Sequence, residues 1–321
     1  MNRSISEFAL IAKYFAPLAV DPAALGLTDD ACVLPQESGR QTVVTADALI
    51  EGVHFLKSDP PALIAAKALR VNLSDLAAKG ADPVGYLMAL ALPRDIEESW
   101  LEKFAHGLSA DQTEFSVSLL GGDTTATPGP LMIAITALGS VPQGEMLRRA
   151  GAGPGDSIYV SGSIGDAGAG LAVLQGELEA GPGAQTLIAR YRRPTPRLSL
   201  GKALRGVATA ALDVSDGLLA DLGHIAEVSG VRLVIEAGRI PRSLALQAVW
   251  PGIEGIMRAA TAGDDYEIAF TAPPGVDVAA AFSKYDVSVT KIGWVEKGEG
   301  VVLLDEGGTA LPVARAGYRH F

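Results

Sequence analysis

Seven segments of the chain carry aspartates in polar or glycine-rich stretches that interrupt short apolar runs. They are TDDACVL (28–34), TADALIEGVHF (45–55), VNLSDLAAKGADP (71–83), GGDTT (121–125), GAGPGD (151–156), LDVSDGLLADL (212–222) and GDDYEIAF (263–270). An aspartate at the end of a buried strand is poorly solvated, so several of them would repel one another unless a hard cation such as Mg²⁺ neutralised them. The pattern therefore predicts turns that join helices and strands around an acidic site.

The apolar runs between these segments predict both helices and strands. Residues 62–80 and 165–174, and the stretch after residue 217, place apolar side chains at helical spacing. Short buried strands are predicted at 42–45, 86–92, 131–138, 157–160, 210–214, 231–235, 267–270 and 301–304. The mixture predicts an α/β protein that contains mixed sheets, of the α+β kind.

The chain is long enough to form two domains. It has 321 residues, of which 48% are apolar, and chains of this length commonly divide into two cores. The stretch VPQGEMLRRAGAGPGD (141–156) contains proline and several glycines, which suits a domain junction. We therefore expect one domain at residues 1–148 and a second α/β domain at 149–321.

Charge and hydropathy exclude several classes of partner. Lys plus Arg number 26 and Asp plus Glu 37, a formal net charge of −11, so most of the surface repels nucleic acid. Glu7 and Lys13 interrupt the N-terminal apolar run, and no apolar stretch approaches the roughly 20 residues that span a bilayer. We expect a soluble cytoplasmic protein with no nucleic acid or membrane partner. Cys32 is the single cysteine, typical of a small core residue rather than a nucleophile.

Two segments combine carboxylates, hydroxyl groups and glycine. Asp213, Ser215 and Asp216 stand beside Gly217, and GGDTT repeats the arrangement around Asp123. A single aspartate of this kind is more often a helix cap, and Asp216 is a fair candidate for one. Together the two segments favour a site for magnesium and the phosphates of a nucleotide, where glycine lets the backbone approach a phosphate.

Familiar alternatives lack their spacing. The chain has no GxxxxGK[ST] loop, and GAGPGD lacks the strand-turn-helix setting of a dinucleotide site. The four histidines, His54, His106, His224 and His320, are too scattered for a zinc site. His224 lies within an apolar helical pattern and is predicted to be structural. His54 lies in an acidic segment, and a ligand role and a structural role are equally consistent with its position.

As a set, the segments resemble the thiamine-monophosphate kinase family, in the superfamily that contains aminoimidazole ribonucleotide synthetase and selenophosphate synthetase. The motifs that carry the resemblance are D-x-L-x-EGVHF (47–55), NLSDLAA (72–78), GGDTT (121–125), D-x-SDGL (213–218), G-x-DYE (263–267) and the terminal HF. The resemblance runs nearly end to end. It implies a two-domain aminoimidazole ribonucleotide synthetase-like fold and ATP-dependent phosphorylation of thiamine monophosphate to thiamine diphosphate.

The resemblance also implies a site, position by position. Magnesium ligands would be Asp30, Thr45, Asp47, Asp75, Asp123, Asp213 and Asp216. ATP would meet Gly122, Asp123, Arg149 and Ser215, and thiamine monophosphate would meet His54, Asp264 and Tyr318. The N-terminal domain would bind ATP and several magnesium ions and pair in a homodimer. No acid or base is expected, because the acceptor phosphate is mostly deprotonated at neutral pH.

The chain departs from the family pattern at a few positions. Thr28 stands where the family usually has glycine, Ala46 replaces a hydroxyl residue, Asp264 replaces a glutamate, and His106 stands at an expected tyrosine. None of these removes a carboxylate from the implied metal cluster.

Two alternative functions are weighed against this reading. Selenophosphate synthetases and hydrogenase-maturation proteins call for a reactive cysteine near one terminus, a place Cys32 does not occupy. A non-catalytic regulator, which would bind ATP without forming product, stays open.

Overall fold

The structure is a computed structural model that describes residues 7–28, 31–32, 34, 37–179, 181–276, 278–282, 285 and 287–318. The chain divides into two compact units, one of Met1–Leu76 with Asp82–Gly144 and the other of Ala77–Ala81 with Glu145–Phe321. Each unit has its own sheet. The assignment of nucleotide binding and dimerisation to residues 1–148, and of a separate domain to 149–321, stays a prediction.

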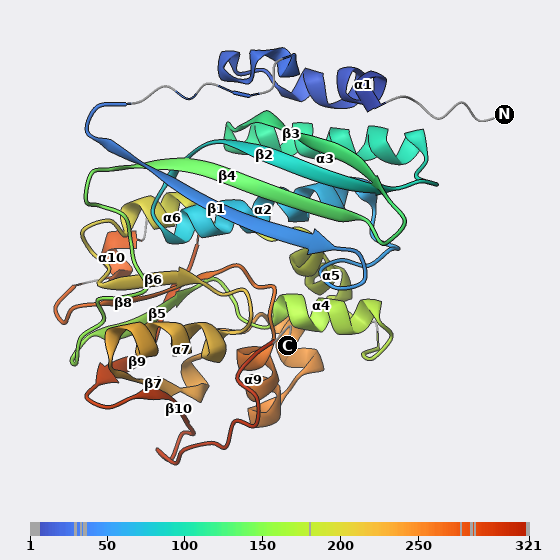
Figure 1. Ribbon diagram of the computed structural model, residues 1–321. Helices are drawn as coiled ribbons and strands as arrows, with labels where there is room; N and C mark the ends of the chain where they lie inside the picture. Colours follow the sequence, from blue (N-terminus) through green and yellow to red (C-terminus); the bar gives the residue numbers. More distant parts are fainter. Residues whose placement is uncertain are drawn as a thin grey trace. The chain divides into compact units, whose positions relative to one another are not determined.

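The first unit is built on a four-stranded sheet of order β1-β4-β2-β3 (Figure 1). Its strands are β1 (Arg40–Ile50), β2 (Asp82–Pro93), β3 (Ser118–Thr127) and β4 (Met132–Pro142). β4 pairs antiparallel with β1 and β2, and β2 pairs parallel with β3. Alternate residues of β4 are buried, so one face of the sheet contributes to the core.

Helices of the first unit come before and between these strands. They are α1 (Glu7–Leu10), the short segments η1 (Ile11–Phe15), η2 (Ala16–Leu18) and η3 (Pro22–Leu27), α2 (Pro61–Ala78) and α3 (Glu98–Phe115). Almost every residue of α2 from Ile64 onward is buried. Its sequence is mostly apolar, as expected of an internal helix, and its buried polar residues include Lys67, Arg70 and Asn72.

The second unit contains a six-stranded sheet of order β10-β7-β9-β5-β8-β6 (Figure 1). Its strands are β5 (Ser157–Ser161), β6 (Ala210–Asp213), β7 (Arg232–Glu236), β8 (Ile268–Ala272), β9 (Val289–Glu296) and β10 (Gly300–Leu304). Only the β10–β7 pair among them is parallel within the described strands. The helical segments are α4 (Asp166–Leu174), α5 (Ala184–Arg192), α6 (Leu198–Ala203), α7 (Leu218–Ser229), η4 (Ala237–Arg239), α8 (Leu244–Val249), α9 (Gly252–Thr261) and α10 (Val278–Phe282).

The core of the second unit joins α7 to the sheet. Leu218, Leu222 and Ile225 on one face of α7 pack in a single buried cluster with Ile158 of β5 and Leu233 of β7. The predicted apolar face of this helix is therefore the face that is buried. The observed mixture of helices and mixed sheets confirms the predicted α/β class.

The prediction that the acidic segments are turns is wrong at two positions, because Asp47 lies within β1 and Asp123 within β3. Asp75 lies within α2, as the helix predicted at 62–80 requires. GGDTT is part of an edge strand, and polar side chains are tolerated there because Gly122, Asp123 and Thr125 are exposed. Asp213 is the last residue of β6, where the predicted strand end is confirmed.

Candidate functional site

In the first unit, a buried face of β1 meets the polar side of α2. The hydroxyl of Thr45 donates a hydrogen bond to Asp75 Oδ2 over 2.6 Å, and Asp47 lies two residues further along the same face of β1. Burial, and then the charge of Asp75, raise the pKa of Asp47 to about 6. Three predicted residues therefore lie together in one acidic cluster: Thr45, Asp47 and Asp75. In this cluster each carboxylate disfavours ionisation of the other.

Asn72 fixes this arrangement and was missed by the sequence reasoning. It is fully buried; its Oδ1 accepts from the backbone N–H of Asp47 over 3.1 Å, and its Nδ2 donates to the carbonyl of Ala68 over 3.0 Å. The signal was present in NLSDLAA, where a polar amide stands three residues before Asp75 within an apolar helix. A buried amide of this kind needs partners, and here one of them is the strand that carries Asp47.

His54 belongs to a tight turn directly after β1. The backbone N–H of Ile50 donates to His54 Nδ1 over 3.0 Å, and the N–H groups of Val53 and His54 return to the carbonyl of Ile50. Lys67 donates to the His54 carbonyl over 2.8 Å. Because Nδ1 accepts, the neutral imidazole carries its proton on Nε2, and the ring presents a donor there.

Asp123 lies at the opposite edge of the sheet from Asp47. The register runs from Asp47 through Ile135 and Met88 to Gly122, the residue before Asp123. Three interstrand spacings therefore separate the two strands, about 14 Å in all. Within the first unit of a single copy of the chain, Asp123 and Asp47 do not lie together. Gly122 is required by packing, since a Cβ there would lie 1.8 Å from the carbonyl oxygen of Met88.

In the second unit, the turn after β6 is organised by a buried carboxylate. Asp221 Oδ2 accepts from the backbone N–H groups of Ser215, Asp216 and Gly217 over 3.0, 3.1 and 3.1 Å. Burial, and then the charge of Asp216, raise the pKa of Asp221 to about 7, although the three N–H groups act in the opposite direction. These N–H groups are therefore directed at Asp221, and the expectation that the backbone beside Gly217 receives a phosphate is not supported.

The start of α7 shows whether Asp216 caps this helix. The N-cap residue of α7 is Gly217, and it makes no side-chain cap hydrogen bond. Asp216 is therefore not the cap of this helix. Asp221, in the first turn of α7, takes up the N–H groups instead, and its place five residues after Asp216 was the signal that the sequence reasoning overlooked.

Two chain segments converge on the Ser215–Asp216 turn. The N–H of Asp264 donates to the Ser215 carbonyl over 2.8 Å, and the N–H of Tyr318 donates to the Asp216 carbonyl over 2.9 Å. Asp264 has a left-handed backbone, with φ of 70°, which is unfavourable for a residue other than glycine and is common at functional sites. Tyr318 is 47% exposed. The structure thus brings together Ser215, Asp216, Asp264 and Tyr318, and Asp213 is buried at the end of the adjoining strand β6.

The residues from the sequence analysis that remain are Asp30, Arg149 and three further histidines. Asp30 and His320 lie outside the described residues. Arg149 is exposed, as are His106 and His224, so His224 is not a core residue. Within the described ranges, no three histidine, cysteine or acidic side chains form a group that could hold a metal ion. The donors that do lie together in the first unit are oxygens, the type that magnesium prefers.

Comparison with known proteins identifies the family. Residues 28–141 match the N-terminal domain of AIR synthase related proteins, and residues 153–306 match their C-terminal domain. The chain is 46% identical to the thiamine-monophosphate kinase of Caulobacter vibrioides over 325 residues, covering 98% of this chain and 91% of the relative. The chain belongs to the thiamine-monophosphate kinase family.

Solved structures of the thiamine-monophosphate kinase family share the fold. The enzyme of Stenotrophomonas maltophilia is 41% identical and superposes with a TM-score of 0.84, covering 97% of this chain and 98% of that one. The structure of AaThiL complexed with AMPPCP and TMP is 33% identical, with a TM-score of 0.80, and covers 99% of this chain and 97% of that one. Membership of the thiamine-monophosphate kinase family confirms the expected aminoimidazole ribonucleotide synthetase-like fold and removes the selenophosphate and hydrogenase-maturation alternatives.

Proposed function

We propose that the chain transfers the γ-phosphoryl group of ATP to thiamine monophosphate, forming thiamine diphosphate and ADP. Relatives that match almost the whole chain are thiamine-monophosphate kinases, and one related structure is a complex with AMPPCP and TMP. The observation that carries the proposal is the convergence in the second unit. The residues expected on the nucleotide side, Ser215 and Asp216, are hydrogen-bonded to Asp264 and Tyr318, expected on the thiamine side.

The roles of these residues follow from their chemistry. Asp213 and Asp216 would hold cations beside the phosphates, and Ser215 would contact ATP together with Gly122, Asp123 and the exposed Arg149. Tyr318 would stack on the cationic thiazolium ring, an interaction to which an accessible aromatic face is suited. Asp264 would face the positive charge of that ring, and His54 would donate from Nε2 to the phosphate of thiamine monophosphate.

Several magnesium ions would be bound, and each unit by itself offers carboxylates suited to them. Thr45, Asp47 and Asp75 present oxygens only, and two carboxylates crowd one buried place, so the set fits a hard divalent cation. Asp30 and Asp123 of the first unit, and Asp213 and Asp216 of the second, would also bind magnesium. Bound magnesium would supply the positive charge that offsets the repulsion between two phosphate groups.

The transfer would be direct, with no phosphorylated enzyme. The accepting phosphate oxygen is mostly deprotonated at neutral pH, so no general base is required. The chain would align the two phosphates in line and exclude water, which are the main tasks of an enzyme in phosphoryl transfer.

A homodimer paired through the first units would complete the site. Asp47 and Asp123 stand on opposite edge strands of one sheet, about 14 Å apart, too far to share a cation. A two-fold dimer can bring Asp123 of one copy to Asp47 of the other, because an isologous interface places two different regions of the same surface against each other. The exposed Val44 on β1, with 59% of its surface accessible, lies on a strand that such a dimer would cover.

The enzyme would act in the cytoplasm, where ATP is available, without a nucleic acid or membrane partner. Among the described residues, none of the helices combines the length and the apolar character needed to cross a bilayer.

A single assay separates this proposal from a regulator that binds ATP without turnover. ADP release is measured with ATP and magnesium, with and without thiamine monophosphate. The kinase releases ADP only when thiamine monophosphate is present. Binding of ATP with no ADP release under either condition would favour the regulator.

A further inference from the structure

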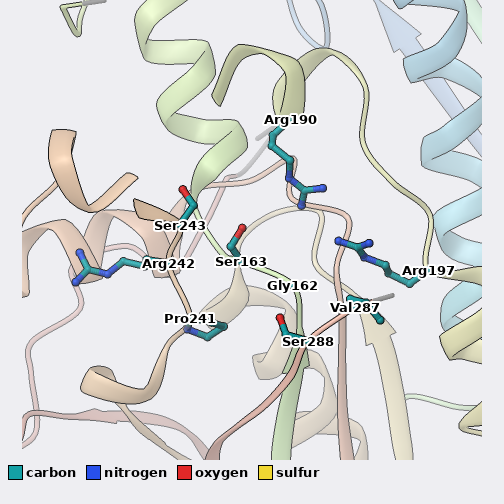
Figure 2. Close-up of a pocket in the computed structure, with 9 residues that line it drawn as sticks. All are labelled: Gly162, Ser163, Arg190, Arg197, Pro241, Arg242, Ser243, Val287 and Ser288. Carbon is teal, nitrogen blue, oxygen red and sulfur yellow. The ribbon is translucent and has the colours of Figure 1, made fainter. Parts of the chain in front are cut away.

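A separate pocket of about 420 Å³ lies in the second unit, next to the residues that follow β5 (Figure 2). Its wall is apolar at Pro241 and Val287 and otherwise includes Gly162, Ser163, Arg190, Arg197, Ser243 and Ser288. Among the described residues that line it there is no carboxylate, and none of the residues assigned above to ATP, magnesium or thiamine monophosphate takes part.

Two arginines dominate one side of this pocket. Arg190 comes from α5 and Arg197 from the residue before α6, and their guanidinium groups point toward each other (Figure 2). Both are bonded to the fully buried Glu267: Arg190 Nη2 lies 2.6 Å from Oε1, and Arg197 Nε lies 2.7 Å from Oε2. One carboxylate thus serves two guanidinium groups, which leaves an excess positive charge facing the pocket.

Two further carboxylates, those of Asp265 and Asp166, lie near the pocket. Burial raises the pKa of Asp265 well above its ordinary value, which favours its uncharged form. Asp166 accepts from the hydroxyls of Ser163 and Ser243 over 2.6 and 2.7 Å. It is the first residue of the nine-residue helix α4, where the partial positive charge of a helix N-terminus favours an acidic side chain. Its charge is therefore stabilised by hydroxyls and by the helix N-terminus, and within the part of the chain that the structure describes it forms no ion pair with either arginine.

The arginine pair also has donor capacity left over. Within the part of the chain that the structure describes, Arg190 Nε is a buried nitrogen without a hydrogen-bond partner. A buried, unmatched donor is unfavourable. Arg242 also lines the pocket but turns its guanidinium away from the pair (Figure 2), where Nη1 donates to the carbonyl of Trp250 over 2.8 Å. The unmatched donor therefore belongs to Arg190, beside Arg197.

We propose that this arginine pocket binds a small molecule through a phosphate or carboxylate group, at a site distinct from that of ATP and thiamine monophosphate. Planar guanidinium groups match the paired oxygens of these anions. The volume is that of a small-molecule site rather than of a groove for a polymer. The anion would rest between Arg190 and Arg197, with the backbone of Gly162 and the hydroxyl of Ser288 at the rim.

Binding is tested by calorimetry in EDTA, with inorganic pyrophosphate and citrate as separate probes. Without a divalent cation the acidic site repels anions, whereas the arginine pocket needs no metal, so the condition isolates the pocket. We expect saturable binding of at least one probe, and the preferred probe identifies whether phosphate or carboxylate is recognised. Absence of saturable binding of both probes would overturn the proposal.

Three variants locate the bound anion. Ser288 is exposed at the rim, and Ser288→Asp places a negative charge beside the anion, which should weaken binding about tenfold. Ser288→Asn is the matched neutral control, and Arg242→Gln removes a charge from the same rim without touching the pair; both should bind nearly as the parent does. Loss of Arg197 is avoided because it would leave the buried Glu267 short of a partner. Binding that Ser288→Asp leaves unchanged would place the anion elsewhere and refute the assignment.

Discussion

The carboxylate of Asp221 holds the backbone of Asp216, with 3.1 Å between Asp221 Oδ2 and the Asp216 nitrogen. It binds the neighbouring N–H groups of Ser215 and Gly217 in the same way. The turn that presents Asp216 is therefore shaped by a second acid behind it. This relationship gives the carboxylate five residues after Asp216 a structural role.

Asp221→Asn should lower kcat while the protein stays folded. The side-chain oxygen of asparagine can accept only some of the three hydrogen bonds, and its NH₂ group is repelled by the remaining N–H donors. Asp216 therefore loses its orientation. We expect a fall in kcat of about 10- to 100-fold, as is usual when a group behind a metal ligand is changed, together with a higher magnesium requirement. Steady-state kinetics across a magnesium titration provide the measurement.

Glu227→Gln is the control for this variant, because Glu227 is an exposed acid on the same helix. It should leave kcat and the magnesium requirement unchanged. If Asp221→Asn behaved like Glu227→Gln, the buried carboxylate would have no part in positioning Asp216.

Asp47→Asn and Asp123→Asn should each abolish turnover, yet complement each other when the two chains share a dimer. If Asp123 of one copy serves the site of the other, a mixed dimer has one intact site and one doubly defective site. Random pairing of equal amounts should then restore about a quarter of the parental activity. Co-expression of differently tagged chains, followed by assay, provides the test. No recovery in isolated mixed dimers would show that both residues act within one copy.

Tyr318→Ala should raise the KM for thiamine monophosphate far more than the KM for ATP. A cation–π contact contributes about 0.5 to 2 kcal/mol, which corresponds to an increase of about twofold to thirtyfold. Tyr318→Phe keeps the ring and should bind thiamine monophosphate nearly as the parent does. An equal increase in both KM values would indicate that the C-terminal segment has only a structural role.

Asp265 should make stability depend on pH. Burial, the largest influence, raises the pKa of this carboxyl well above its ordinary value, so its stabilising contribution is full below about pH 4 and is lost as the pH rises through the folded pKa. Asp265→Asn is neutral throughout. As the pH rises, the free energy of unfolding of the variant should therefore increase relative to that of the parent, by up to about 1.4 kcal/mol per pH unit.

Denaturant unfolding of both proteins at several pH values gives this difference. Asp95→Asn, at an exposed position, should show no such trend relative to the parent. A difference between the parent and Asp265→Asn that stays constant with pH would mean that the buried carboxyl keeps one protonation state.

Local patterns were sufficient to predict much of the fold. The apolar character of residues 62–80 predicts α2, and the apolar face after residue 217 predicts α7. The edge strand β3 was missed, because Gly121 to Thr125 are polar or small and β propensity depends on the neighbouring strand. Also missed were strand β9 and the helices α1, α3, α5, α6, α8, α9 and α10.

The residues of the candidate site could be predicted in kind but not in arrangement. The motifs indicate Asp47, Asp75 and Asp216, whereas the supports Asn72 and Asp221 act through contacts that sequence spacing does not reveal. The separation of Asp47 and Asp123 depends on strand order, which follows from long-range pairing. The arginine pocket likewise assembles residues from several distant segments.

Direct transfer of the phosphoryl group to thiamine monophosphate is tested by following a radiolabelled γ-phosphate from ATP. The enzyme is incubated with labelled ATP, magnesium and thiamine monophosphate, and the products are separated. All transferred label should appear in thiamine diphosphate, in equal amount to the ADP formed, with none on the protein. Label recovered as inorganic phosphate or bound covalently to the chain, with no labelled thiamine diphosphate, would contradict direct transfer.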